Sequence, residues 1–328
     1  MKIAVAGATG AVGQQMIMCL EERLPDAEVK ALASLRSAGK VLEFKKKYVV
    51  EELTEHSFDD VDYVLGATEN PITAQWAPLA VKAGAVVIDN SSLYRLDEDV
   101  PLVIPEINPE DIRTHHGIIS NPNCATIIAL VAVNALHRRW HVERMIVSTY
   151  QAVSGAGLQG IRDLENQIKD PSIPSVAFPH PIAYNLIPQI GGFDAEGYSS
   201  EERKMQNEGR KIWHHEKLLV NCTCVRVPTM RSHCESITLQ FRDRPDLEEA
   251  RELLKKAEGV VYADAPSEHL YPTPLMTSDQ DLVYVGRLRE DISDPLKHSL
   301  VLFCSGDQIR KGAATNTVQI LERLLAEK

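Results

Sequence analysis

Short apolar runs alternate with helical spacing over the first third of the chain. Strands are predicted at residues 3–6, 29–33, 62–67 and 86–89, and helices from about residue 12 and over 74–82. Strands that alternate with helices are typical of βαβ units, whose strands form a parallel sheet. The pattern therefore predicts a parallel-sheet α/β domain at the start of the chain.

From about residue 146 the runs become longer and their side chains alternate, as in residues 222–227 and 235–241. This alternation is typical of antiparallel sheets with one buried face. A helical pattern follows at 246–257, and another at 311–327, where Val318, Leu321, Leu324 and Leu325 have helical spacing. We expect an α+β domain with a mostly antiparallel sheet, and a C-terminal helix that returns to the first domain.

Length and charge narrow the picture. At 328 residues the chain exceeds the size of a single core, so we predict one domain from residues 1–123 and 307–328 and another from 124–306. The formal net charge of −11 argues against nucleic acid and anionic membranes, because both reward clustered positive charge. The longest nearly apolar stretch, 124–136, is shorter than the roughly 20 residues that cross a bilayer. With no signal-peptide pattern at its start, the chain is expected to be cytoplasmic, and its six cysteines to be reduced.

A glycine loop joins the first predicted strand to the first predicted helix. Its spacing is G-x-x-G-x-x-G, and backbone N–H groups in such a turn can approach a pyrophosphate at the helix N-terminus. The alternative is a tight turn that binds nothing. The residues predicted to contact a dinucleotide here are Gly7, Ala8, Thr9, Gly10, Ala11, Val12 and Gly13.

The end of the second predicted strand indicates which dinucleotide binds. An NAD site would place a carboxylate there for the ribose 2′-hydroxyl. The chain instead has Ser34, Arg36 and Ser37, and an arginine flanked by hydroxyls suits a 2′-phosphate. We therefore predict NADP, with a solvated basic loop as the alternative.

Cys124 is the candidate nucleophile. It follows a predicted strand at 117–120 and opens the apolar helix, and a helix N-terminus lowers the pKa of a thiol. A thiolate beside a nicotinamide suggests acyl transfer through a thioester, which needs an acid or base. His233, between two strand-like runs, is the candidate for that role. The alternatives are a small core cysteine and a surface or core histidine.

Eight stretches resemble the aspartate-β-semialdehyde dehydrogenase family, in the same order and over nearly the whole chain. They are GATGAVG from Gly7, RSAGK from Arg36, AGAVVIDNSSLYR ending at Arg95, SNPNCAT from Ser120, QAVSGAG from Gln151, EERKM from Glu201, RVPTMRSH from Arg226 and RKGAATN from Arg310. The resemblance implies a Rossmann-like cofactor domain and a catalytic domain that supports dimerisation.

The implied reaction is the reversible conversion of L-aspartate 4-semialdehyde, phosphate and NADP+ to L-4-aspartyl phosphate and NADPH. It belongs to the aspartate pathway to lysine and diaminopimelate, threonine, methionine and isoleucine. By the resemblance, Cys124 attacks the acyl phosphate, hydride reduces the thioester, and His233 is the general acid/base.

Substrate charge and resemblance together assign four binding residues. Arg226 is suited to fork the α-carboxylate, and Glu201 to accept from the ammonium group. Lys204 and Arg95 are assigned to phosphate. Glu201 and Lys204 lie three residues apart, so one helix face could present both; the alternative is an ordinary exposed ion pair.

Five further residues match the family motifs. Two match its positioning and oxyanion-side amides, and three match its nicotinamide-side positions: Gln151 and Asn123, then Ser154, Gly155 and Asn316. The chain departs from the family pattern at residues 66–71, at Cys234 and at residues 307–309, where the departure bears on local cofactor contacts. Cys222 and Cys224 are expected to be core residues, and no metal is predicted because paired ligand spacing is absent.

Two other functions remain open at this point. N-acetyl-γ-glutamyl-phosphate reductase shares the thioester chemistry, but its acylated substrate has no ammonium group for Glu201. A dinucleotide-binding relative without catalysis should have lost Cys124 or His233, and both are present. The expected partners are the small-molecule substrate, phosphate and, from the family's sheet, a second copy in a homodimer.

Overall fold

The computed structural model describes residues 1–327, and the chain divides into two units. The first is Met1–Asn123 together with the residues from Ala313 onward, and the second is Cys124–Gly312. The expected boundary at 306/307 therefore differs from this division. Residues 307–312 join the second unit because Asp307 and Gln308 bond to Arg231 and Ser232 there.

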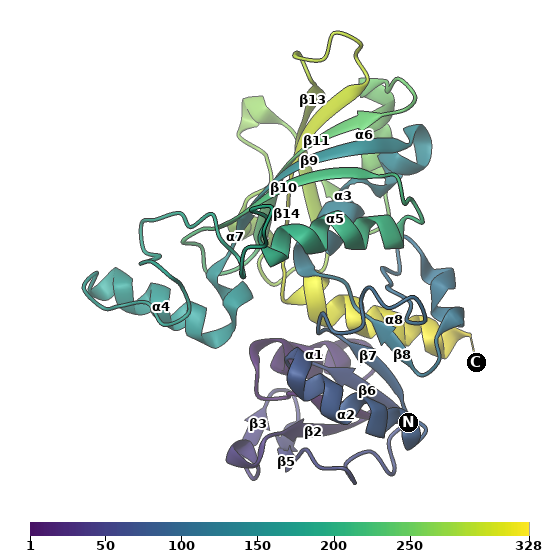
Figure 1. Cartoon of the computed structure of the whole chain (residues 1–328), viewed down its shortest axis with the longest axis vertical. Helices are drawn as coiled ribbons and strands as arrows, with labels where there is room; N and C mark the ends of the chain where they lie inside the picture. Colours follow the sequence, from purple (N-terminus) through teal and green to yellow (C-terminus); the bar gives the residue numbers. More distant parts are fainter. Residues whose placement is uncertain (328) are drawn as a thin grey trace. The chain divides into compact units, whose positions relative to one another are not determined.

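The first unit is built on a parallel sheet of six strands (Figure 1). Every pairing in it is parallel, and the strand order is β5 (Glu51–Glu52), β2 (Glu28–Ala33), β1 (Lys2–Ala6), β6 (Tyr63–Gly66), β7 (Val86–Asp89), β8 (Ile118–Ser120). Its helices are α1 (Ala11–Arg23), α2 (Asn70–Lys82) and α8 (Thr315–Ala326), and β3 (Val41–Glu43) and β4 (Lys47–Val49) form a hairpin. The predicted strands and helices of this unit are confirmed, although α2 begins four residues before the predicted start.

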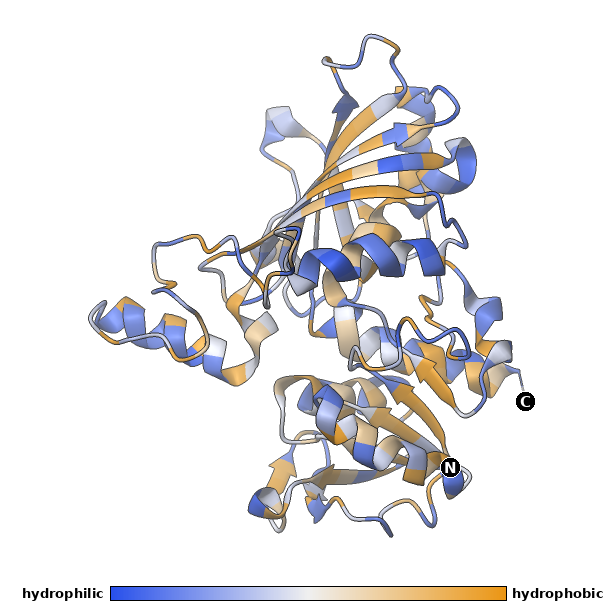
Figure 2. Ribbon diagram, in the orientation of Figure 1, coloured by the Kyte–Doolittle hydropathy of each residue, from blue (hydrophilic) through white to orange (hydrophobic). Residues whose placement is uncertain are grey.

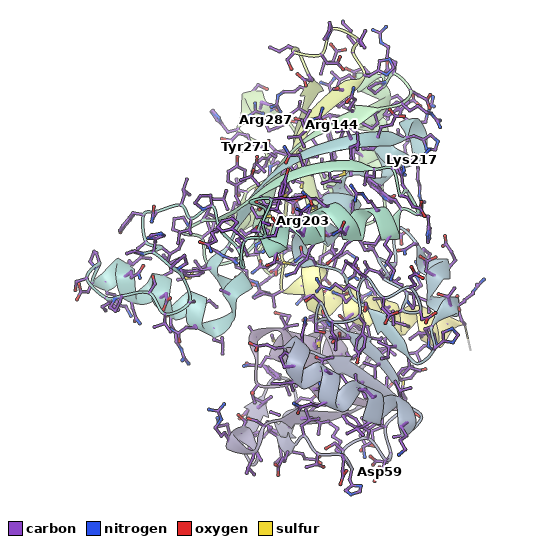
Figure 3. All side chains as sticks on the ribbon, in the orientation of Figure 1. Asp59, Arg144, Arg203, Lys217, Tyr271 and Arg287 are labelled. Atoms are coloured by element: carbon purple, nitrogen blue, oxygen red, sulfur yellow. The ribbon has the colours of Figure 1, made fainter. Side chains whose placement is uncertain are left out.

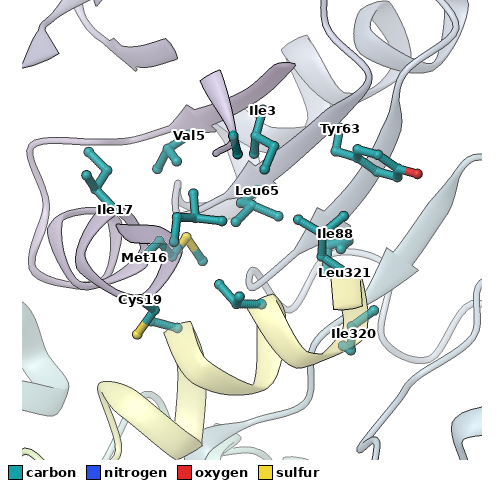
Figure 4. Close-up of a cluster of buried hydrophobic side chains, with 14 of the residues drawn as sticks. Ile3, Val5, Met16, Ile17, Cys19, Tyr63, Leu65, Ile88, Ile320 and Leu321 are labelled. Carbon is teal, nitrogen blue, oxygen red and sulfur yellow. The ribbon is translucent and has the colours of Figure 1, made fainter. Parts of the chain in front are cut away.

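Side-chain alternation along β1 explains the layers of this unit. Ile3 and Val5 point to one face and pack with α1 and α8, whereas Ala4 and Ala6 point to the other and pack with α2. Figure 4 shows Ile320 and Leu321 of α8 in the first of these clusters. Burial of this apolar stripe fixes α8 to the sheet of the first unit.

The second unit contains a mixed sheet of six strands. Their order is β10 (Leu219–Arg226), β9 (Val142–Gln151), β11 (His233–Phe241), β14 (Ser299–Gly306), β13 (Val283–Glu290), β12 (Val260–Tyr262). The three central pairings are antiparallel, as predicted, while β10 with β9 and β12 with β13 are parallel.

Three longer helices pack against this sheet: α3 (Cys124–Trp140), α5 (Ser200–Ile212) and α6 (Leu247–Lys255). The others are α4 (Gly157–Lys169) and α7 (Pro274–Thr277), and a π-helical turn, η5 (Arg310–Ala314), leads into α8. Helix α3 is buried almost all round, which accounts for its apolar sequence. Within residues 1–327, no helix has both the length and the apolar character needed to cross a membrane.

Candidate active site

Strand register brings three polar side chains together where three neighbouring strands of the second unit's sheet begin or end. Arg226 ends β10 and pairs with Gln151, which ends β9. Cys234 pairs with Tyr150, so His233, the first residue of β11, lies opposite Gln151. All three residues are less than 9% exposed. A continuous row of arginine, amide and imidazole results from segments that are far apart in sequence.

Cys124 is the first residue of α3, so the structure places it at a helix N-terminus as expected. It is partly exposed, whereas the other five cysteines are buried. A Cβ on Gly312 would lie 2.8 Å from the Cβ of Cys124, so only glycine lets this backbone pass so close to the thiol. Cys124 is therefore reachable but tightly bounded on one side.

The Arg226 guanidinium links the cysteine to the row. Its Nη1 donates to the Ala152 carbonyl oxygen at 2.6 Å, and its Cζ lies 5.8 Å from the centre of the Phe178 ring. Burial lowers the pKa of Arg226, while negative charge on Glu201 and on Cys124 opposes that effect. Three acidic groups, Glu201, Cys124 and Cys224, thus act on the charge of Arg226, and one of them is the candidate nucleophile.

His233 is held as a neutral ring. The Ala152 N–H donates to Nδ1 at 3.1 Å, so the neutral imidazole carries its proton on Nε2. Burial, and then the positive charge of Arg226, lowers the pKa of His233 to about 3. A Cβ on Gly155 would lie 3.2 Å from His233 Cε1, so glycine is needed where this loop crosses the ring. Nε2 is the nitrogen left to act on a substrate.

Helix α5 presents Glu201 and Lys204 on one face, as their spacing predicted. Lys204 Nζ lies 2.9 Å from Glu201 Oε2, and Gln151 Nε2 donates to Glu201 Oε1 at 3.2 Å. The helix is fixed by a capping box between Ser199 and Glu202, whose carboxylate also accepts from the Cys224 N–H of β10. Gln151 Oε1 is buried without a partner in the described chain, which leaves it available to a ligand.

The glycine loop of the first unit has the shape of a dinucleotide cradle. Gly7 has φ +90°, and a Cβ there would lie 2.4 Å from the Ala67 carbonyl oxygen. A Cβ on Gly13 would lie 2.2 Å from the Gly7 carbonyl oxygen, so α1 and the loop touch backbone to backbone. The first turn of α1 carries no acidic residue, which keeps its N-terminus attractive to an anion. These features fit the pyrophosphate of NAD(P).

Ser34, Arg36 and Ser37 follow β2 at the same sheet edge as the glycine loop. Gly7 N and Ala8 N both donate to Leu32 O at 2.9 Å, so the two segments are neighbours, and Arg36 is exposed there. The sequence did not predict the edge strand β5, which brings the exposed Glu51 and Glu52 beside the end of β2. The turn that carries Arg36 therefore lies next to the negative charges of Glu51 and Glu52.

The other assigned residues of the first unit are buried. Arg95 donates from Nη2 to Asn90 O at 2.7 Å, and Asn123 is the last residue before α3. Asn316 donates its amide hydrogens to Val103 O and to Asn121 Oδ1.

Comparison with known proteins decides the family. Residues 2–115 match the semialdehyde dehydrogenase, NAD binding domain, and residues 133–311 match the semialdehyde dehydrogenase, dimerisation domain. An aspartate-semialdehyde dehydrogenase from Aquifex aeolicus is 47% identical, over 99% of this chain and 98% of that protein. The chain belongs to the aspartate-semialdehyde dehydrogenase family.

Two solved structures are similar over the same extent. The structure of aspartate semialdehyde dehydrogenase II from Vibrio cholerae, complexed with ASA, is 40% identical with a TM-score of 0.95, and covers 99% of this chain and 98% of its own. That of aspartate semialdehyde dehydrogenase with NADP from Candida albicans is 25% identical with a TM-score of 0.78 and has the same coverage. The α/β fold with its two kinds of sheet is therefore that of aspartate-semialdehyde dehydrogenases.

Three further groups shape this candidate site, and the sequence alone assigned none of them a role, although Ala152 and Gly312 lie within the matched stretches. The Ala152 N–H acts through its backbone, Gly312 acts by lacking a side chain, and Phe178 lies in the proline-rich connection after α4. Cys222 and Cys224 are buried with their sulfurs 3.5 Å apart, as expected of core residues. Among the described residues, no group of three or more His, Cys, Asp or Glu could hold a metal ion.

Proposed function

We propose that the chain is a cytoplasmic enzyme that interconverts L-aspartate 4-semialdehyde plus phosphate and L-4-aspartyl phosphate, with NADP(H) as the redox partner. In biosynthesis it would run reductively, toward lysine, diaminopimelate, threonine, methionine and isoleucine. The observation that carries the proposal is the row of Arg226, Gln151 and His233, with Cys124 close enough to Arg226 to oppose the lowering of its pKa.

The chemistry follows from these groups. The Cys124 thiolate attacks the acyl carbon, the bond from that carbon to the phosphate oxygen breaks, and a thioester and free phosphate result. Bound NADPH supplies the hydride that reduces the thioester. The resulting hemithioacetal collapses to the aldehyde and returns the thiolate of Cys124.

His233 and the neighbouring amides assist at the acyl oxygen. His233 is the general acid/base, and it acts through Nε2 because Nδ1 is engaged with Ala152. Gln151 and Asn123 would position the substrate and stabilise the oxyanion. The overall reduction consumes one proton, which ends on the released phosphate.

Substrate recognition follows the charges of aspartyl phosphate. Arg226 would fork the α-carboxylate, Glu201 would accept from the ammonium group, and Lys204 would bind the phosphoryl group, to which we also assign Arg95. Glu201 already joins Gln151 to Lys204, so one carboxylate organises both the amide and the lysine. An N-acetylated substrate has no ammonium group to donate to Glu201.

For the cofactor we propose NADP, held by the glycine loop from Gly7 to Gly13, by Ser34, Arg36 and Ser37, and on the nicotinamide side by Ser154, Gly155 and Asn316. Arg36→Ala should weaken NADP binding by about tenfold while leaving NAD unchanged, because only NADP offers a 2′-phosphate. Lys45→Ala, in the exposed turn between β3 and β4, is the control, because it removes a positive charge outside the loop that carries Arg36. Equal losses for NADP and NAD would show that Arg36 does not read the 2′-phosphate.

The assay that tests the function is phosphate-dependent NADP+ reduction, followed by NADPH absorbance, with L-aspartate 4-semialdehyde. N-acetyl-glutamate semialdehyde is run in parallel. Turnover of the free amino acid alone supports the proposal. Turnover only of the acetylated compound would support the rival reductase, and no turnover with NADP binding intact would indicate a relative without catalysis.

The second unit also supports a homodimer. Side chains alternate between the two faces of its sheet. The face opposite the catalytic row carries the exposed side chains of Ile146, Tyr150 and Leu219. The Tyr150 ring lies 6.1 Å from that of Phe303, which lines a cavity of about 380 Å³. Tyr271 and Arg287, labelled in Figure 3, line the same cavity, and Cys124 does not. Ile146 and Tyr150 lie on β9 and Leu219 on β10, and Figure 2 shows apolar colouring along parts of these strands. An exposed apolar sheet face, in a unit that matches a dimerisation domain, fits a second copy of this chain.

Sedimentation at micromolar concentration tests the dimer. Ile146→Glu should produce monomers, because it places a charge within the proposed interface. Ile292→Glu is the matched control, since Ile292 is fully exposed in the loop between β13 and β14. A wild-type protein that sediments as a monomer would contradict the proposal.

A further inference from the structure

The segment after β14, residues 307–312, runs through the part of the second unit that carries Cys124 and His233. It is neither a strand nor part of α8, yet Asp307 and Gln308 are at most 3% exposed. Gly312, at its other end, lies against Cys124. The segment therefore touches more of the site than its irregular backbone suggests.

Asp307 makes this segment rigid. One carboxylate oxygen accepts from the Ile309 N–H at 2.9 Å and the Arg310 N–H at 3.0 Å. The other accepts from Arg231 Nε at 2.6 Å and the Asp279 N–H at 2.7 Å. With four donors on one buried carboxylate, the loop that carries Gln308 is held in a single position.

The side-chain amide of Gln308 forms hydrogen bonds with two loops, and both loops adjoin His233. Its Oε1 accepts from the Ser232 N–H at 2.8 Å, and its Nε2 donates to Ser154 Oγ. Ser232 immediately precedes His233 and has φ +71°, a left-handed conformation that a serine rarely adopts and that needs support from its surroundings. The hydrogen bond from Gln308 supplies such support.

The second loop fixes the imidazole from its other side. Ala152 N donates to His233 Nδ1, and the Gly155 backbone lies against the ring. Ser154 lies between these two residues, in the short 3-10 helix Val153–Ala156, so its hydroxyl fixes the loop that sets the ring's tautomer. One glutamine thus ties together the backbone before His233 and the loop that contacts its ring.

We propose that Gln308 is a positioning residue that holds His233 Nε2 in line for proton exchange by joining the Ser232 and Ser154 loops. It touches no reacting atom, and its effect passes through His233. The inference rests on the proposed function, and it adds a residue that neither composition nor the family motifs single out.

The test compares Gln308→Met, which keeps the length of the side chain but removes both hydrogen bonds, with Gln308→Glu. For Gln308→Met we expect kcat to fall by between about ten and a hundredfold, since small misplacements of catalytic groups cost that much, while KM for the semialdehyde changes by less than about threefold. The rate of Cys124 alkylation should stay at the wild-type value, because the nucleophile does not depend on this amide. Gln280→Leu, an exposed glutamine in the same unit, is the control.

Gln308→Glu should restore most of kcat, because its carboxylate accepts from Ser232 N–H and from the Ser154 hydroxyl. Its negative charge should also move the acidic limb of the pH–rate profile upward, by favouring the protonated imidazole. Wild-type kcat in Gln308→Met would overturn the inference, as would equal losses of kcat, Cys124 alkylation and thermal stability without rescue by Gln308→Glu. A wild-type enzyme with no turnover would instead refute the proposed function, so the two failures are distinguishable.

Discussion

The two units place their functional groups by different means. In the first, the glycine loop is shaped by its backbone: Gly7 and Gly13 let one turn approach Ala67 and α1, and the proposed pyrophosphate contacts are backbone N–H groups. In the second, the chemistry is made of side chains: Arg226, Gln151 and His233 come from three strands and meet by register.

The difference follows from what cofactor binding and catalysis each require. A pyrophosphate needs several N–H donors close together, and a short local segment can supply them. Thioester chemistry needs a thiol, an acid or base and charged anchors around one carbon, which no short segment can supply. Binding is therefore local in sequence, whereas catalysis depends on the tertiary fold.

The largest expected effect separates chemistry from binding. Cys124→Ser should lower turnover by roughly a thousandfold or more, because a serine hydroxyl is far less ionised than a thiol near neutral pH. NADP affinity, measured by fluorescence titration, should be unchanged. Cys234→Ser is the control. Cys234 is next to His233 on β11, so its side chain points to the opposite face, where its sulfur bonds to Ser305 of β14. Turnover retained in Cys124→Ser would remove the thioester from the mechanism.

A smaller effect is expected when the backbone cradle is changed instead. Gly13→Ala places a Cβ 2.2 Å from the Gly7 carbonyl oxygen, and the strain, of about 1–3 kcal/mol, should weaken NADP binding by about tenfold or more. Gly10→Ala is the matched control, because its Cβ would lie 3.4 Å from the same oxygen and should cost less than about threefold.

Cys124 alkylation should proceed at the wild-type rate in both glycine variants. If Gly13→Ala slowed alkylation as much as it weakened NADP binding, the damage would extend through the fold. The contrast between a local cradle and a separate catalytic cluster would then fail.

The same contrast explains what the sequence could predict. The parallel sheet, α1 and the glycine loop follow from periodicity and glycine spacing, because those signals are local. The position of Cys124 at the start of α3 also followed, since strand, turn and helix are consecutive. The pairing of Glu201 with Lys204 followed from helical spacing.

Other features depend on partners that sequence spacing does not show. The parallel edge pairs β10 with β9 and β12 with β13 were not predicted, because register across a sheet is a long-range property. The short strand β5 has two glutamates and no apolar pattern, so packing alone reveals it. Gln308 and Glu235 became visible only when their buried surroundings were known.

The smallest expected effect concerns Glu235, a buried residue on the same strand as His233 and next to the catalytic row. It lies two residues after His233 on β11, is fully buried, and has no hydrogen-bond partner in the described chain for either carboxylate oxygen. Burial, and then the charges of Cys224 and Glu201, raises the pKa of Glu235 well above its ordinary value of 4.5. The folded protein should therefore keep this carboxyl protonated at pH values above 4.5, where an unfolded glutamate is already ionised.

A raised pKa in the folded state has a definite sign for stability. Above pH 4.5 the unfolded chain loses the Glu235 proton while the folded chain keeps it. The contribution of Glu235 to stability therefore falls as pH rises, by at most about 1.4 kcal/mol per pH unit, until the folded pKa is reached. Glu235→Gln keeps the shape and cannot titrate. Its free energy of unfolding, measured in urea from about pH 5 to about pH 8, should gain on the wild type as pH rises.

His233 does not confuse this comparison, because its pKa is lowered in the folded state and its contribution is lost as pH falls below 6.5. That loss occurs in both proteins and cancels in their difference. A difference that stays constant with pH would mean that Glu235 titrates normally in the fold. The catalytic row would then rest on a charged layer instead of a neutral one, and Glu201 would share its electrostatic field with a second carboxylate.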